Sequence, residues 1–121
     1  MTLKILVADD DLDNRTIATE TLRAAGYEVC TATDGVEAVA SALKEKPDLI
    51  LVDLSMPKMD GWETVKRLKT APETSNIPVI AFTAHAMQGD EQKARDAGCD
   101  GFLTKPCPPK KIIEKIKEWI E

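Results

Sequence analysis

Five short apolar segments alternate with five longer segments of helical spacing, and this alternation constrains the possible folds most strongly. The apolar segments are rich in β-branched and aliphatic residues and lie at residues 3–8, 28–32, 49–52, 79–82 and 101–104. Such an alternation favours a parallel sheet, because each right-handed crossover lays a helix on one face of the sheet. We therefore predict an α/β protein with a doubly wound, flavodoxin-like parallel sheet of five strands and with helices on both faces.

The segments between the strands carry helix start and stop signals. Asp13 and Asn14 can cap a first helix that ends at Gly26. The apolar stripe of this helix would consist of Ala18, Leu22 and Ala25. Further helices are expected at residues 35–46, 62–70 and 90–98, and a last one opened by Pro108 and Pro109, with Ile112, Ile113, Ile116 and Ile120 on one face.

Size and charge limit the class of protein. With 121 residues the chain matches the size of one domain, which we place at residues 1–121. A net charge of −5 disfavours binding to nucleic acids and to anionic membranes. The longest apolar run, 49–52, is too short to span a bilayer, and the N-terminus lacks the apolar core of a signal peptide. We expect a cytoplasmic protein with neither a nucleic acid nor a membrane as partner.

The cysteines do not indicate a disulfide framework or a metal site. Cys30, Cys99 and Cys107 are odd in number and have no Cys-x-x-Cys spacing, and no histidine lies close in the sequence to complete a zinc site. We expect all three to be reduced thiols that behave as small apolar side chains.

Chemically active side chains follow the predicted strands. Asp9 and Asp10 follow the first strand, Asp53 the third, Thr83 the fourth and Lys105 the fifth. In a doubly wound sheet, ligands bind at the carboxyl ends of the strands. These five residues are therefore expected to converge at one edge of the sheet.

Three carboxylates in one place repel one another unless a cation is bound between them. Mg²⁺ suits an all-oxygen site with few protein ligands. Asp10, Asp53 and the backbone carbonyl of Ser55 could bind it, with Asp9 as a ligand either directly or through water. If Asp53 attacks a phosphoryl group, then Lys105 and Thr83 could stabilise the charge that develops on its oxygens.

Taken singly, these residues also have ordinary structural roles: Asp9 or Asp13 would more often be a helix cap, Thr83 a strand end and Lys105 a solvated lysine. Other classes of protein with such residues fit less well. An aspartyl-phosphate phosphatase normally has a general acid two residues after its nucleophile, where this chain has Ser55. A flavodoxin-like binder of small molecules would need a Gly- or Ser-rich phosphate loop after the first strand, where residues 9–11 are all Asp.

Four motifs in order resemble the response-regulator receiver domain, and the resemblance covers essentially the whole chain. They lie at residues 5–10, at 47–57 with Asp60 and Gly61, at 78–84 and at 97–106. The resemblance implies the strand order 2-1-3-4-5 and phosphorylation of Asp53, in the presence of Mg²⁺, by a histidine kinase or a histidine phosphotransfer protein. Such a domain accepts phosphate and assists its own phosphorylation and dephosphorylation, but it is not otherwise an enzyme.

The resemblance also implies a switch and a peptide geometry. Thr83 would turn toward the phosphoryl group, and the ring of Phe102 would follow into the vacated space. The peptide bond between Lys105 and Pro106 would be cis, so that the ammonium group points into the site. His85, the only histidine, stands where such domains modulate the lifetime of the phosphate; we do not expect it to donate phosphate.

The expected partners are proteins. Because the sequence stops at residues 119–121, we expect a stand-alone domain that signals to a downstream protein target, as a monomer or a weak phosphorylation-dependent dimer. The phosphate donor would bind the start of the first helix, and the target the face formed by the fourth helix, fifth strand and fifth helix. An unphosphorylated scaffold and a receiver fragment of a hybrid histidine kinase remain as alternatives. The donor-binding residues would be Leu12, Asn14, Arg15 and Ile17, although helical spacing leaves the exposure of Ile17 open.

Overall fold

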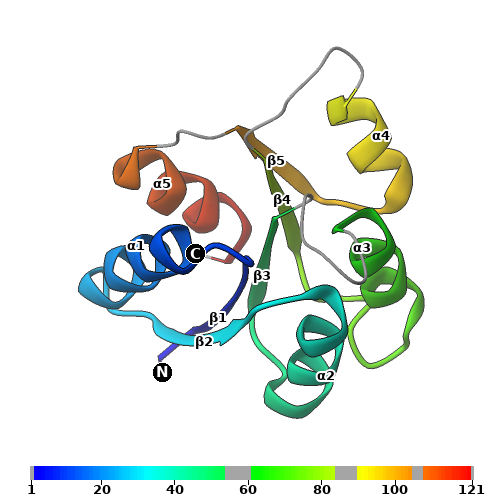
Figure 1. Ribbon diagram of the computed structural model, residues 1–121, viewed down its shortest axis with the longest axis horizontal. Helices are drawn as coiled ribbons and strands as arrows, with labels where there is room; N and C mark the ends of the chain where they lie inside the picture. The colour runs from blue at the N-terminus through cyan, green and yellow to red at the C-terminus, as the bar shows by residue number, and fades with distance from the viewer. Residues whose placement is uncertain (1, 54–60, 84–89, 105–107, 121) are drawn as a thin grey trace.

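Five strands and five helices alternate along the chain, as the sequence predicts (Figure 1). The computed structural model describes residues 2–53, 61–83, 90–104 and 108–120. The strands are β1 (Lys4–Ala8), β2 (Glu28–Ala32), β3 (Leu49–Asp53), β4 (Val79–Thr83) and β5 (Gly101–Thr104). The helices are α1 (Leu12–Ala24), α2 (Gly35–Glu45), α3 (Gly61–Thr70), α4 (Asp90–Ala97) and α5 (Pro109–Ile120).

All strands run parallel in one sheet of order β2-β1-β3-β4-β5. This confirms both the predicted sheet type and the strand order that the resemblance implied. The register pairs Ala8 with Val52 and Asp53 with Phe82. Because all strands point the same way, their carboxyl ends lie along one edge of the sheet.

Helices cover both faces of the sheet. Figure 1 shows α1 and α5 on one face and α2, α3 and α4 on the other. Side chains alternate along each strand, so that Leu49 and Leu51 pack with the α1–α5 side while Ile50 and Val52 pack with the opposite side. The α5 residues of the predicted apolar face belong to the α1–α5 core, with Ile112 and Ile116 buried and Ile113 and Ile120 partly buried.

The prediction for the start of α1 was wrong by two residues. Asp11, rather than Asp13 or Asn14, is the N-cap, because its carboxylate accepts a hydrogen bond from the backbone N–H of Asn14 at 3.1 Å. Asp13 lies in the first helical turn. At the other end, Ala25 is an exposed C-cap and does not extend the apolar stripe.

Two of the cysteines lie in the described part of the chain. Cys30 is partly buried and Cys99 is buried, and both are free thiols. Cys107 lies outside the described residues. Across residues 2–53, 61–83, 90–104 and 108–120, no helix combines the length and the apolar character needed to cross a membrane.

Candidate functional site

The ends of β1 and β3 bring two carboxyl groups side by side. Ala8 pairs with Val52 across the sheet, so the next residues, Asp9 and Asp53, follow at neighbouring positions of the same edge. Asp53 is the last residue of β3 and Asp9 directly follows β1. Both residues are buried: 4% of the surface of Asp53 and 3% of that of Asp9 are exposed.

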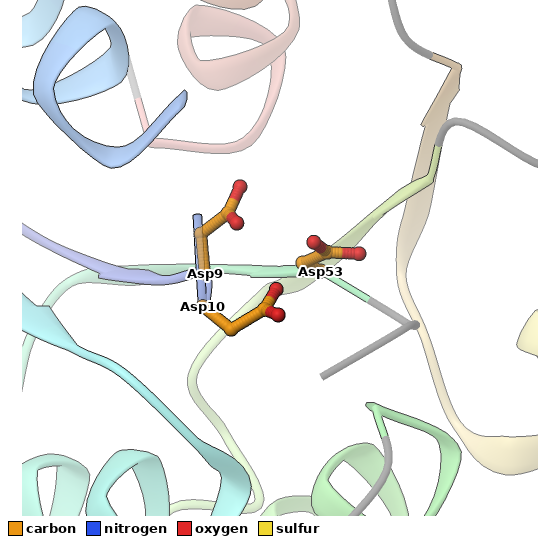
Figure 2. Close-up of side chains that lie close together, drawn as sticks. All are labelled: Asp9, Asp10 and Asp53. Atoms are coloured by element: carbon orange, nitrogen blue, oxygen red, sulfur yellow. The ribbon is translucent and has the colours of Figure 1, made fainter. Parts of the chain in front are cut away.

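Asp10 completes a group of three carboxylates. One carboxylate oxygen from each of Asp9, Asp10 and Asp53 lies within 4.8 Å of the others. Figure 2 shows Asp9 and Asp10 at the end of β1, opposite Asp53. Unlike its two neighbours, Asp10 is exposed, so the group opens to solvent on one side. The structure therefore brings together the three aspartates that the sequence predicts as metal ligands.

The turn between β1 and α1 is held by local hydrogen bonds. The backbone N–H of Asp11 donates to the carboxylate of Asp9 at 2.9 Å, and the carboxylate of Asp11 caps α1. The guanidinium group of Arg15 donates to the backbone carbonyl of Asp9 at 2.9 Å. The turn that carries Asp9 and Asp10 is thereby tied to the first turn of α1.

Asp9 and Asp53 border a mostly apolar cavity on the α1–α5 side of the sheet. Its volume is about 10 Å³, at the lower limit of what can hold one water molecule, and its lining includes Asp9, Asp53, Phe82, Leu103 and Ile112. Asp53 thus has an apolar surface beside it and other carboxylates near it. Such surroundings strengthen the interaction of a carboxylate with a cation.

The donor set fits a hard divalent cation. Two buried carboxylates and one exposed carboxylate offer oxygen ligands only, and the exposed side leaves room for water or a phosphoryl oxygen. A bound cation would also offset the repulsion among the three negative charges.

Thr83 and Phe102 lie on the neighbouring strands of the same sheet. Thr83 is the last residue of β4, and its backbone pairs with Thr104 at the end of β5. Phe102 pairs with Ala81 and is partly buried against the core on the α2–α3–α4 side. The backbone therefore places Thr83 at the edge that carries the carboxylates, with Phe102 on the next strand.

Several predicted site residues lie outside the described residues. These are Ser55, Lys105, Pro106 and His85, so their predicted roles stay predictions. Lys105 follows β5, which ends at Thr104, and Ser55 comes two residues after the end of β3.

The predicted donor-binding residues have different surroundings. Leu12 and Ile17 are 65% and 55% exposed, which answers the open question about Ile17. Asn14 and Arg15 are partly buried. Sequence reasoning missed that the side chain of Arg15 turns back onto the end of β1. The only available signal was a basic residue six positions after Asp9.

A family model described as the response regulator receiver domain matches residues 5–117. The polar-differentiation response regulators DivK of Brucella ovis and Brucella anthropi are each 38% identical over 120 residues. Each of these alignments covers 99% of this chain and 98% of the relative.

Solved structures agree with this match. The chemotaxis protein CheY4 of Vibrio cholerae superposes with a TM-score of 0.93 at 34% identity, covering 98% of this chain and 99% of the other. The receiver domain of a sensor histidine kinase from Pseudomonas aeruginosa, with a magnesium ion coordinated in its active site cleft, has a TM-score of 0.92 at 32% identity, covering 99% of this chain and 98% of the other. With its carboxylate group, its strand order and these relatives, the chain belongs to the response regulator receiver domain family.

Proposed function

We propose that this chain is a CheY-like response regulator that accepts a phosphoryl group on Asp53. The observation that carries the proposal is the group formed by Asp9, Asp10 and Asp53, whose carboxylate oxygens lie within 4.8 Å of one another at the carboxyl edge of the sheet. Receiver domains are signalling proteins that receive phosphate from histidine kinases or phosphotransfer proteins and act on downstream targets.

In the proposed reaction, a carboxylate oxygen of Asp53 attacks the phosphorus atom of the donor in line with the bond that breaks. A P–O bond forms to Asp53, and the electron pair of the broken bond leaves with the phosphohistidine nitrogen. Asp53 is buried, and a fixed orientation of its acceptor oxygen would favour in-line attack. The proposed role of Lys105 and Thr83 is to donate hydrogen bonds to phosphoryl oxygens as their charge develops.

Asp9, Asp10 and Asp53 would bind Mg²⁺, together with the backbone carbonyl of Ser55. When bound, Mg²⁺ supplies positive charge to the carboxylates and to one phosphoryl oxygen. The all-oxygen donor set supports this assignment, as does the magnesium ion in the related receiver from Pseudomonas aeruginosa.

Signal output is proposed to run through Thr83 and Phe102. A phosphoryl group on Asp53 would draw the hydroxyl of Thr83, and the ring of Phe102 would move in response. Support comes from the placement of these residues on the paired strands β4 and β5, next to β3. The changed surface around α4, β5 and α5 would bind the target protein.

The phosphate donor is proposed to dock on the start of α1. Leu12 and Ile17 are exposed apolar side chains close in sequence to Asp9 and Asp10, and exposed apolar groups beside a site favour a protein partner. Asn14 lies between them in sequence.

A phosphotransfer assay tests acceptor and docking surface together. A histidine phosphotransfer protein that phosphorylates the wild type should transfer no phosphate to Asp53→Asn. Ile17→Glu should receive phosphate at least about 10-fold more slowly from this protein, because docking would bury the charge of the new glutamate. It should receive phosphate at the normal rate from a small-molecule donor. Full-rate transfer from the protein to Ile17→Glu would disprove docking at α1, and transfer to Asp53→Asn would disprove the acceptor.

A further inference from the structure

We propose that Arg15 is a positioning residue for the carboxylate group rather than a contact for the phosphate donor. In this role it would fix the turn after β1 so that Asp10 faces Asp53. The inference rests on the proposed function, because it assigns Arg15 a role in preparing the magnesium site.

Asp9 forms hydrogen bonds through its backbone and its side chain. Its backbone N–H donates to the carbonyl of Ala32 at 3.1 Å, and its carbonyl accepts from Nη1 of Arg15 at 2.9 Å. Its carboxylate accepts from the N–H of Asp11 at 2.9 Å. The backbone of Asp9 is thus held from two sides, by β2 and by α1.

Arg15 contacts the backbone just beyond the end of the strand pairing. β1 ends at Ala8 and β2 ends at Ala32, so the regular strand pairing stops just before the peptide that joins Asp9 to Asp10. This peptide decides the direction in which the Asp10 side chain leaves the backbone, and Arg15 holds its oxygen. Asp10 is exposed and gains little orientation from packing. The Arg15 hydrogen bond is therefore well placed to keep the Asp10 carboxylate within reach of Asp53.

Arg15 is itself held in the first turn of α1. Its backbone N–H donates to the carbonyl of Asp11 at 2.9 Å, within the first turn of α1. Arg15 is partly buried, while the neighbouring Leu12 and Ile17 are more than half exposed. One N–H of its guanidinium group is engaged by the carbonyl of Asp9, whereas the two apolar side chains face solvent.

The competing possibilities predict different results for Mg²⁺ binding. If Arg15 orders the ligands, its removal weakens Mg²⁺ binding. If it acts only as a positive charge beside three carboxylates, its removal strengthens Mg²⁺ binding, because like charges repel. If it serves only to bind the donor protein, Mg²⁺ binding does not change.

The experiment compares three variants by calorimetric titration with Mg²⁺. Arg15→Met keeps an apolar stem but removes the donor and the charge, and Arg15→Lys restores one donor and the charge. Arg23→Met removes the same charge from an exposed position in the last turn of α1 and serves as the matched control. Arg15→Met should bind Mg²⁺ about 10-fold more weakly, as is typical when a group that orients a ligand is lost. Arg15→Lys should recover most of this loss, and Arg23→Met should bind like the wild type.

Hydrogen exchange in metal-free buffer supplies a second measurement. The amide of Asp11, which donates to Asp9, should exchange faster in Arg15→Met than in the wild type or in Arg23→Met. Unchanged or tighter Mg²⁺ binding by Arg15→Met, or unchanged exchange at Asp11, would overturn the positioning role. A wild-type protein that binds no Mg²⁺ would instead refute the proposed magnesium site, and the role of Arg15 with it.

Discussion

Asp53 and Cys99 are both buried, but they lie in different surroundings. Asp53 sits beside an apolar cavity and near two other carboxylates, an arrangement that calls for a cation. Cys99 lies in the core on the α2–α3–α4 side of the sheet, and burial raises the pKa of its thiol to about 12. The sequence predicted the carboxylate group from residue type and position after a strand, and it predicted a reduced, apolar cysteine from the number and spacing of the cysteines. It could not predict the Arg15 contact, which depends on a side-chain orientation.

The raised pKa of Cys99 predicts a loss of stability in alkali. Unfolding exposes a thiol whose ordinary pKa is 9.0, whereas the folded protein keeps this thiol protonated up to about pH 12. The contribution is therefore complete below pH 9 and is lost as the pH rises above it, by up to about 1.4 kcal/mol per pH unit. Urea unfolding at pH 8 and pH 10 should show a smaller decrease for Cys99→Ala than for the wild type. Equal decreases in the free energy of unfolding would show that Cys99 ionises as easily in the folded protein as in the unfolded chain.

Helix boundaries show where local sequence information becomes insufficient. Asp11, Asp13 and Asn14 are all good N-caps, and only the observed hydrogen bond from the N–H of Asn14 identifies Asp11 as the cap of α1. In α2 the cap is Asp34, whose carboxylate accepts from the N–H of Glu37 at 2.8 Å. At the other end of α2, Lys46 adopts a left-handed conformation with φ of 48°. A lysine in the sequence does not predict this conformation.

A glycine at position 46 should therefore stabilise the protein. Glycine adopts the left-handed conformation without the steric cost of a Cβ atom, so Lys46→Gly should raise the free energy of unfolding by about 0.5–1 kcal/mol. Lys46→Ala is the control, because it removes the same side chain but keeps the Cβ atom. Chemical denaturation of both variants measures the effect. A gain in Lys46→Ala equal to that in Lys46→Gly would contradict the explanation.

The two edges of the sheet differ in what they carry. The carboxyl ends of the strands carry the carboxylate group, and the opposite ends carry a network of polar contacts that joins α3 to β4 and β5. The alternation of strands and helices predicted the parallel sheet, but the strand order followed only from the family resemblance, since apolar runs do not state which strands are neighbours. At the amino ends of β4 and β5, Lys69 of α3 forms an ion pair with Asp100 at 3.0 Å and donates a hydrogen bond to the carbonyl of Ile77 at 3.0 Å. Asp100 also accepts from the N–H of Val79, at the start of β4. Residues 31 positions apart form this ion pair, so no local pattern could predict it.

Loss of Lys69 should destabilise the protein without affecting the site. Both side chains of the pair are less than one-third exposed, so removing the cation leaves a partly buried carboxylate with one partner fewer. Lys69→Met should lower the free energy of unfolding by about 1–3 kcal/mol, with unchanged Mg²⁺ affinity. Lys66→Met, at an exposed position of the same helix, should change stability by less than about 0.5 kcal/mol. Similar losses in the two variants would show that the ion pair between Lys69 and Asp100 adds no specific stability.

Intact-mass spectrometry with a small-molecule phosphodonor tests, without any partner protein, whether Asp53 accepts a phosphoryl group in the presence of Mg²⁺. Wild type and Asp53→Asn would be incubated with and without Mg²⁺, alongside Asp13→Asn, which alters an acidic residue in the first turn of α1. We predict a gain of one phosphoryl group in the wild type and in Asp13→Asn only when Mg²⁺ is present, and no gain in Asp53→Asn. A gain that persists in Asp53→Asn, or no gain in the wild type with Mg²⁺, would contradict Mg²⁺-dependent phosphorylation of Asp53.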